Sequence, residues 1–229
     1  MNKIFIPLSI IISALIIAGA VFLTKGTTDT DTIVENESGT PDFSIRSVSE
    51  DDHILGNPDA DIIIVEYSDY ECPFCAKFHP TMEKIIEEYG EEGKVAWVYR
   101  HFPLDQIHKR ARSSSEASEC VAKLGGNSAF WNFSKILFGD QENSLSDAGL
   151  KAAALETGVD GDEYQTCVDE RQTKDLVNED FEDGRLISSA DPNFGTPYSI
   201  AITKDGRQIP IRGAQPYEQV KGIIDELLK

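Results

Sequence analysis

The chain has 229 residues, enough for one domain of about 150–200 residues with additional segments. Hydrophobic residues make up 40% of it and charged residues 27%, as in an ordinary soluble globular protein. Its 40 acidic and 21 basic side chains give a formal net charge of −19 at pH 7. A surface of this sign repels nucleic acid phosphates and anionic lipid headgroups. Both are therefore excluded as partners, and we interpret the acidity as a source of solubility.

An apolar segment without any charge extends from Ile4 to Leu23. Its 20 residues are about the number that a helix needs to cross a bilayer. Its length favours an uncleaved membrane anchor over a cleaved signal peptide, for which Lys3 would be the basic region and Ala18-Gly19-Ala20 the cleavage site. We expect residues 1–25 to be one or the other, and both place the rest of the chain outside the cytoplasm.

Residues 26–50 are rich in polar and acidic side chains and show no apolar periodicity, which predicts a flexible linker. The domain is then expected over residues 51–229. It begins with a short apolar strand, His53-Ile54-Leu55, which a turn at Gly56-Asn57-Pro58 follows. The β-branched run Asp61–Tyr67 predicts a central strand that is buried on both faces.

Two cysteines separate this strand from an amphipathic helix, which Gly90 ends. The apolar segment Lys94–Arg100 predicts the next strand. A strand–helix–strand unit of this size implies a parallel pair of strands joined by a right-handed crossover.

A helical block is expected from about residue 104 to 190. Asp105 is predicted to cap a helix that ends at Gly125-Gly126, and Asn127 to cap a short aromatic helix. Further helices are expected from Ser146 or Asp147 to Gly158, over Asp160–Glu170 and over Lys174–Ser188.

The chain closes with a predicted hairpin and a helix. Strands are expected over Ile200–Thr203 and Gln208–Arg212, with the hairpin signal Asp205-Gly206 between them. Pro216 opens the last amphipathic helix. The order of elements is thus β-β-α-β, a helical block, and β-β-α, which indicates an α/β fold.

The segment Cys72-Pro73-Phe74-Cys75 lies directly after a buried strand and at the start of a helix, an arrangement typical of redox-active cysteines. If Cys72 is the N-cap, its sulfur faces free backbone N–H groups, and the helix dipole favours the thiolate. Pro73 at the first helical position removes no needed donor. Stabilising the reduced thiolate makes the disulfide form an oxidant.

Other uses of this motif fit the sequence less well. A zinc site needs two more ligands, and the remaining cysteines, Cys120 and Cys167, stand apart in the helical block. A haem attachment site needs histidine where Ala76 stands. We therefore expect no metal and no other cofactor.

Glu66 interrupts the apolar strand six residues before Cys72. A carboxylate is costly at a buried position unless it has a task, such as carrying a proton to or from Cys75. The residues alone leave open a second interpretation, in which Glu66 lies near the end of the strand with its carboxylate in water.

The sequence resembles the DsbA-like branch of the thioredoxin superfamily, over roughly residues 51–229. The resemblance rests on the segments Glu66–Cys75, Phe78-His79-Pro80 and Gly195-Thr196-Pro197, together with the inserted helical block. It implies a thioredoxin-like fold, with Cys72 as attacking thiol, Cys75 as resolving thiol and Glu66 as buried acid. It also implies a cis bond between Thr196 and Pro197, in a loop that holds substrate backbone like an added strand, with Pro73 and Phe74 contributing to the same surface.

The remaining cysteines and histidines receive less specific interpretations. We expect Cys120 and Cys167 to form a structural disulfide, because two thiols in an oxidising compartment tend to pair, as in some relatives of this branch; two buried free thiols are the alternative. His79 is interpreted as a packing or surface residue, and no role is assigned to His101 or His108.

The function expected from these features is that of an extracytoplasmic oxidase that introduces disulfides into reduced secreted proteins. In that case a quinone-linked membrane partner would reoxidise it. An isomerase or reductase is the main alternative, and a chaperone-like binding module with an inactive motif is the second. Residues 26–50 are too short for a dimerisation domain, so we expect a monomer.

Overall fold

The computed structural model describes Phe43 and residues 45–229. The segment predicted as a membrane anchor or signal lies outside these residues. Among the helices that are described, none is both long and apolar enough to span a bilayer.

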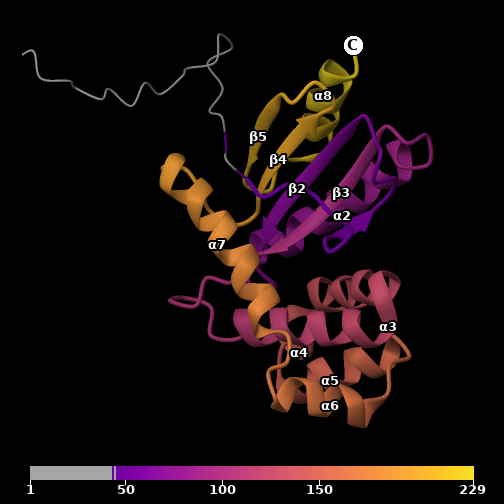
Figure 1. The fold of residues 1–229 in the computed structure, drawn as a ribbon, viewed down its shortest axis with the longest axis vertical. Coiled ribbons are helices and arrows are strands. Elements are labelled where there is room, and N and C mark those ends of the chain that lie inside the picture. Colours follow the sequence, from indigo (N-terminus) through magenta and orange to yellow (C-terminus); the bar gives the residue numbers. More distant parts are fainter. Residues whose placement is uncertain (1–42, 44) are drawn as a thin grey trace, which may run out of the picture. The chain divides into compact units, whose positions relative to one another are not determined.

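A five-stranded sheet forms the centre of the fold, in the order β1-β3-β2-β4-β5 (Figure 1). Strands β2 and β3 are parallel, and the other neighbouring pairs are antiparallel. The strands are β1 (His53–Leu55), β2 (Ile62–Ser68), β3 (Val95–His101), β4 (Tyr198–Thr203) and β5 (Gln208–Arg212). The predicted parallel pair, β2 and β3, is therefore present, and the crossover helix Pro73–Tyr89 connects these two strands along the chain.

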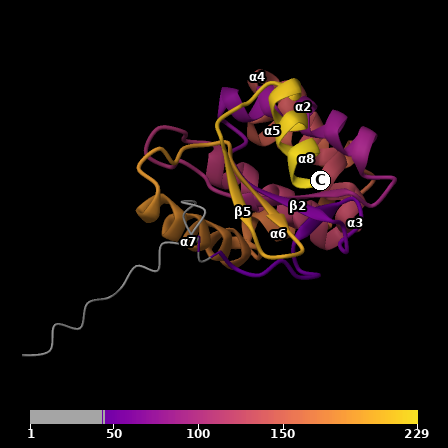
Figure 2. The same ribbon diagram turned by 90° about the horizontal axis from the view of Figure 1, so that it is seen from above.

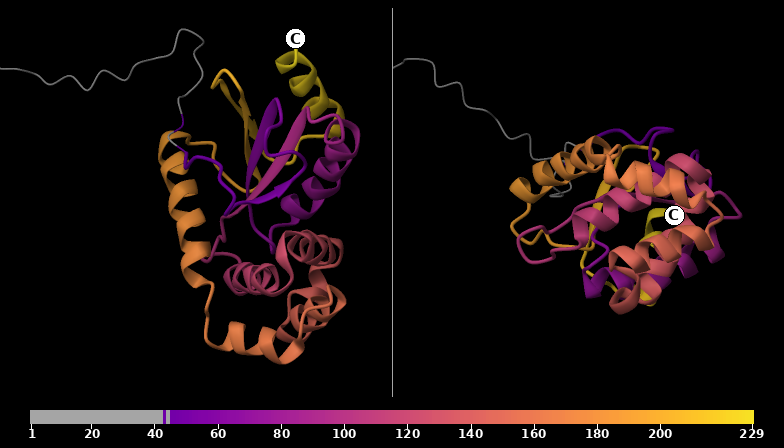
Figure 3. Two further views of the ribbon diagram at one scale, coloured as in Figure 1. Left: turned by 45° about the vertical axis from the view of Figure 1, so that its right-hand side comes forward. Right: turned by 90° about the horizontal axis from the view of Figure 1, so that it is seen from below.

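Helices cover both faces of the sheet. The helices are α2 (Pro73–Tyr89), α3 (Ala111–Gly139), α4 (Gln141–Ser144), α5 (Asp147–Glu156), α6 (Gly161–Asp169), α7 (Lys174–Ala190) and α8 (Tyr217–Leu227). Helices α2 and α8 lie on one side of the sheet and α7 on the other, whereas α3 to α6 form a block at one end of it (Figures 2 and 3).

The alternation of side chains along β2 divides the core in two. Ile62 and Ile64 face α2 and α8, in a cluster that also includes side chains of the helical block. Val65 and Tyr67 face the opposite way, toward Ile187 of α7. The continuous β-branched run of β2 is therefore buried on both faces, as the sequence predicted.

The helical block departs from the sequence prediction at its start. The helix expected to begin at Asp105 begins at Ala111. The carbonyl of Leu104 accepts the N–H groups of Ile107 and His108 in a turn, and Asp105 pairs with Arg112 instead of capping a helix. A tertiary contact, from the Leu104 N–H to Asp69, holds this segment outside the helix.

The interruption predicted at Gly125-Gly126 is present, because Gly126 takes φ of 75° in the middle of α3. Asn127, however, is not a cap: its Nδ2 donates to the carbonyl of Ile54 in β1. The Ser146 hydroxyl does cap α5, accepting from the Gly149 N–H. A disulfide between Cys120 and Cys167 joins α3 to α6.

The linker predicted over residues 26–50 is wrong at its C-terminal end. Phe43 is 2% exposed and packs in the core beside Tyr198. Arg46 forms ion pairs with the nearby Asp52 and with Asp180 of α7. Local composition does not predict these contacts, because Tyr198 and Asp180 lie more than 130 residues away along the chain.

Candidate functional site

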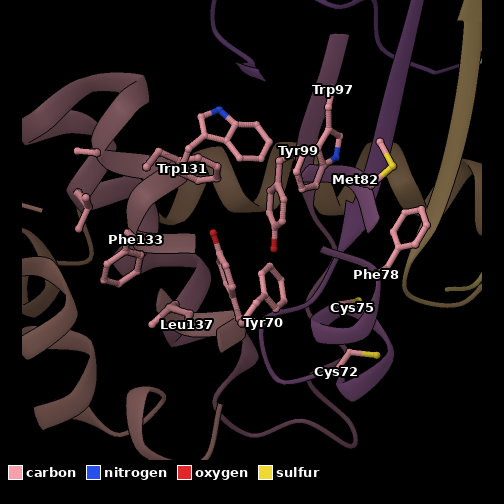
Figure 4. Close-up of a cluster of buried hydrophobic side chains, with 14 of the residues drawn as sticks. Tyr70, Cys72, Cys75, Phe78, Met82, Trp97, Tyr99, Trp131, Phe133 and Leu137 are labelled. Carbon is pink, nitrogen blue, oxygen red and sulfur yellow. The ribbon is translucent and has the colours of Figure 1, made fainter. Parts of the chain in front are cut away.

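Cys72 occupies the N-cap of α2, and Pro73 stands at the first helical position. The Cys72 carbonyl accepts the N–H groups of Cys75 and Ala76, which start the helix. The Cys72 thiol lies 3.3 Å from the carbonyl oxygen of Thr196, to which it donates. Cys72 and Cys75 are both free thiols at the turn from β2 into α2 (Figure 4).

The surroundings of Cys72 favour its ionised form. The Cys75 side chain and the backbone N–H groups of Cys75 and Phe74 hydrogen-bond to the sulfur and outweigh the effect of burial. Together they lower the pKa of the Cys72 thiol to about 6. At neutral pH the sulfur is therefore mostly thiolate, the nucleophilic form.

Cys75 has the opposite character. It is fully buried, and burial together with its bond to Cys72 raises the pKa of its thiol well above the usual value. The charge of Glu66 acts on Cys75 in the same direction. The two sulfurs are thus chemically distinct, one an acidic thiol at a helix terminus and one a thiol that keeps its proton.

Glu66 projects from β2 onto the face that α2 covers and is 1% exposed. Burial raises the pKa of its carboxyl to about 7, although the Trp97 indole donates to Oε2 over 3.0 Å and lowers it. The interpretation of Glu66 as a residue with its head in water is therefore wrong. A carboxyl with this pKa can both give and take a proton near neutral pH.

The loop before β4 completes the surroundings of Cys72. The Thr196–Pro197 peptide bond is cis, and both residues are buried. A surface pocket of about 380 Å³ lies beside the loop, with Thr196, Phe74 and Lys77 among its lining residues. Phe74 is 62% exposed, so an apolar ring stands open to solvent two residues from the reactive sulfur.

Gln141 and Asp69 hold the reactive turn in place, and sequence analysis missed both. The Gln141 amide donates to the carbonyls of Tyr70 and Cys72, at 2.7 and 3.0 Å. The Asp69 carboxylate accepts from the Glu71 N–H and from the His108 imidazole. Asp69 could have been suspected from its place beside the motif, but Gln141 lies 69 residues from Cys72 and carries no local signal.

His79 is a packing residue. It is 4% exposed and lies between Trp97 and Phe138, at ring distances of 5.0 and 4.8 Å. Burial lowers the pKa of its imidazole to about 4, so the ring is neutral at pH 7. The Cys120–Cys167 disulfide lies within the helical block, away from the reactive pair.

Comparison with known proteins agrees with this geometry. The family model described as Thioredoxin matches residues 48–226. The Na(+)/H(+) antiporter NhaA 1 of Mycolicibacterium vanbaalenii is 34% identical over 146 residues, which are 62% of this chain and 23% of the antiporter. The chain thus spans about a quarter of the length of that relative. A putative protein-disulfide oxidoreductase of Rickettsia bellii is 29% identical over 162 residues, covering 66% of this chain and 56% of the relative.

Solved structures show the same fold. Alpha-DsbA1 of Wolbachia pipientis superposes with a TM-score of 0.66 at 25% identity, over 79% of this chain and 92% of that one. Oxidised BdbD of Bacillus subtilis gives a TM-score of 0.63 at 23% identity, over 77% and 92%, and shows a likeness of fold. The chain belongs to the thioredoxin family and is DsbA-like in fold.

Proposed function

We propose that this protein is an extracytoplasmic oxidase that passes a Cys72–Cys75 disulfide to reduced secreted proteins. The contrast between the two sulfurs carries the proposal. The pKa of Cys72 is about 6, whereas Cys75 is buried and keeps its proton. An acidic Cys72 stabilises the reduced form of the protein, and this makes its disulfide form an oxidant.

The exchange proceeds in two steps. A substrate thiolate attacks Sγ of Cys72 in the disulfide form, a mixed disulfide forms, and the Cys75 sulfur leaves. Glu66, buried and with a carboxyl pKa of about 7, supplies the proton that the Cys75 thiolate takes up. A second substrate thiolate then attacks the substrate sulfur of the mixed disulfide, and Cys72 leaves as the thiolate. The substrate thereby loses two electrons, and the pair of cysteines gains them.

The surface around Cys72 supports binding of an extended peptide. The Thr196 carbonyl already lies 3.3 Å from the Cys72 sulfur, so a chain that follows this loop would place its own sulfur at Cys72. Backbone recognition of this kind gives affinity without a strict requirement for sequence. Pro73 and Phe74, both exposed, would contribute apolar contact on the other side of the substrate.

The location is proposed from the N-terminal sequence. The uncharged segment Ile4–Leu23 would hold the domain outside the cytoplasm as a membrane anchor, or direct its export as a signal peptide. Residues 1–25 would then be the anchor or signal segment, and the linker would follow it. In that position the protein would act as a monomer, and a quinone-linked membrane partner would accept two electrons from the reduced pair.

The reduction potential of the Cys72–Cys75 pair tests the direction of electron flow. Equilibration of the full chain with glutathione buffers should give a value near about −120 mV for an oxidase. A value near about −270 mV would assign the protein to the reductases instead. If the Cys72–Cys75 pair cannot be reduced and reoxidised reversibly, the protein has no exchange activity, and the binding module is the alternative that remains.

Single serine variants test the roles of the two cysteines. Cys72→Ser should abolish oxidation of a reduced peptide, since no attackable sulfur remains at the helix terminus. Cys75→Ser should accumulate mixed disulfides between Cys72 and substrate, because no second thiol is left to attack Sγ of Cys72 and release the substrate. Normal release of substrate by Cys75→Ser would contradict the assigned roles.

A further inference from the structure

Two histidines and a glutamate from three separate elements converge on one point of the structure. His53 of β1 and His101 of β3 each place Nε2 near the same oxygen, Oε1 of Glu119 in α3, at 2.7 and 2.8 Å. The ligand atoms of the three side chains all lie within 4.8 Å of one another. Within residues 45–229 and Phe43, no other group of three such side chains gathers in this way.

The three side chains are held before any ligand arrives. His101 is fully buried, and the Glu119 side chain is 7% exposed. The His53 ring stacks on Phe130 of α3 with ring centres 3.6 Å apart. The His101 backbone N–H donates to Asp180 of α7. Preorganised side chains of this kind lose little conformational freedom when they bind.

The charges around the cluster leave an excess of negative charge. Four buried or half-buried carboxylates share this region with two guanidinium groups, so two negative charges remain when both imidazoles are neutral. The carboxylates are those of Asp52, Asp180, Asp183 and Glu119, and the guanidinium groups are those of Arg46 and Arg100. A divalent cation would balance the excess.

The donor set indicates which cation fits. Two imidazole nitrogens and one carboxylate oxygen are typical ligands of zinc and of neighbouring transition metals, whereas calcium and magnesium prefer oxygen ligands alone. A tetrahedral zinc ion with bonds of about 2.0–2.1 Å holds its ligand atoms roughly 3.4 Å apart. The present Nε2–Oε1 hydrogen bonds of 2.7 and 2.8 Å would have to open by about 0.6–0.7 Å to reach that spacing.

Space for a fourth ligand lies next to the cluster. A pocket of about 370 Å³ has His53, Glu119 and Asp180 among its lining residues, and it is open to solvent. A water molecule could occupy the remaining position from this side. The metal would take the Nε2 lone pairs, so each imidazole would keep its single proton on Nδ1.

We propose that His53, His101 and Glu119 bind one divalent transition-metal ion of the zinc class. The ion would tie β1 and β3 of the sheet to α3, and so fasten the helical block to the thioredoxin-like part of the chain. This role is structural and does not depend on the proposed oxidase activity.

Zinc binding by the untagged full chain is the first test. The Cys72–Cys75 pair is kept as its disulfide, because free thiols would also take zinc. The chain is stripped with a chelator, exposed to a slight excess of Zn²⁺ and desalted, and its metal content and thermal midpoint are measured. We expect one Zn²⁺ per chain and a raised midpoint. A chain that retains no zinc, or whose midpoint does not move, would overturn the proposal.

Two variants with the same change separate the cluster from other histidines. His53→Gln removes one ligand at a half-buried position and should weaken Zn²⁺ affinity by at least about tenfold. His108→Gln is the matched control, because His108 bonds to Asp69 and lies outside the cluster. Equal affinities of the two variants would contradict the site. Circular dichroism shows whether each variant folds, and Glu119→Gln provides a second ligand variant.

X-ray absorption at the zinc edge of the wild-type chain needs no variant at all. The spectrum should show imidazole scattering and only nitrogen and oxygen neighbours. Sulfur in the coordination shell, or no imidazole, would assign the metal to another place and refute the proposal.

Discussion

Trp97 of β3 donates a hydrogen bond from its indole Nε1 to Oε2 of Glu66 in β2, over 3.0 Å, and both side chains are buried. This bond orients the carboxyl on the face of the sheet that α2 covers. It also opposes the effect of burial, which raises the pKa of Glu66 to about 7. Burial and this bond therefore act in opposite directions on the pH at which the Glu66 carboxyl changes its protonation state.

Replacing Glu66 by Gln should remove the proton donor for Cys75. In the wild type the carboxyl is protonated below about pH 7, so it can supply a proton to Cys75 there and loses this ability above. We expect Glu66→Gln to slow oxidation of a reduced peptide by about tenfold or more below pH 7, with the deficit shrinking above it. Stopped-flow measurements over pH 5–9 check this. Glu87→Gln, on the exposed side of α2, is the control and should match the wild type at every pH.

Trp97→Phe should shift the pH profile of peptide oxidation toward higher pH. Without the indole donor the Glu66 carboxylate loses a stabilising hydrogen bond, so its pKa rises further. The lost bond and the smaller ring should also lower the free energy of unfolding, by about 1–3 kcal/mol. Trp131→Phe serves as control, because Trp131 packs 4.6 Å from Trp97 in the same cluster. If the pH profile of oxidation moved to higher pH by the same amount in both variants, packing around Glu66 and not the hydrogen bond from Trp97 would determine the profile.

The acidity of Cys72 can be measured by alkylation of the reduced protein. With a thiol pKa of about 6, the rate should rise through pH 6 and level off near neutral pH, while Cys75 stays unreacted. Cys75→Ala should shift the midpoint to higher pH, because it removes the hydrogen bond from Cys75, which is the largest of the effects that lower the pKa of Cys72. A midpoint near that of an ordinary thiol, about pH 8.5, would contradict the assigned environment.

The same pKa predicts how the stability of the reduced protein depends on pH. The folded-state pKa of Cys72 lies below that of the thiol in the unfolded chain, so ionisation favours the folded state. This contribution should be complete above about pH 8.5 and should be lost as pH falls through about 6. Urea unfolding of the reduced and oxidised forms should show it as a difference in pH dependence, because the disulfide form has no thiol to ionise.

Removing the Cys120–Cys167 disulfide should destabilise the helical block and leave the redox chemistry unchanged. The bond joins α3 to α6 across a sequence separation of 47 residues. Closure of a loop of this length stabilises the folded state by up to about 4 kcal/mol in the chain-entropy model. The double variant Cys120→Ala with Cys167→Ala should lose about 3–4 kcal/mol in urea unfolding. A change in the reduction potential of Cys72–Cys75 would show that the two pairs are coupled.

Arg100→Met should be among the most destabilising single changes. Arg100 is fully buried and bonds to Asp52 at 2.8 Å and Asp183 at 2.7 Å. Although burial raises the pKa of Asp52, Arg100 lowers it overall. Without Arg100 the buried Asp183 loses its ion pair and Asp52 keeps only the one with Arg46, which should cost about 3–5 kcal/mol at neutral pH.

The pH dependence of this loss has a definite sign. Because the folded-state pKa of Asp52 is depressed, its contribution is present above about pH 4 and is lost as pH falls below that value. The difference in the free energy of unfolding between the wild type and Arg100→Met should therefore become smaller in acid. Arg112→Met breaks a partly exposed pair with Asp105 and should cost less than about 1 kcal/mol. A similar loss in both variants would contradict the importance assigned to burial.

Local signals sufficed for the elements that carry the reactive pair. The β-branched run of β2, the Cys72-Pro73 start of α2 and the hairpin at Asp205-Gly206 all lie where the sequence predicted them. Each of these features depends on contacts within a few residues, or on the regular spacing of apolar side chains along the buried face of a strand or helix.

Local signals failed where a distant partner decided the outcome. Asp105 has the side chain of a helix cap, but the Leu104 N–H bonds to Asp69, and the helix starts six residues later. Phe43 lies in a polar segment whose composition predicts a linker, yet its side chain packs in the core against Tyr198.

The sequence by itself determined the order of strands and helices and the pair of cysteines at a helix terminus, because these follow from periodicity and from neighbours along the chain. Only the tertiary structure decided what surrounds them. It placed Trp97 on Glu66, Gln141 on the turn at Cys72, and His53 with His101 and Glu119. Those contacts join residues up to 69 positions apart, and a carboxylate or imidazole acquires its pKa and its ligand chemistry from partners that only folding brings within bonding distance.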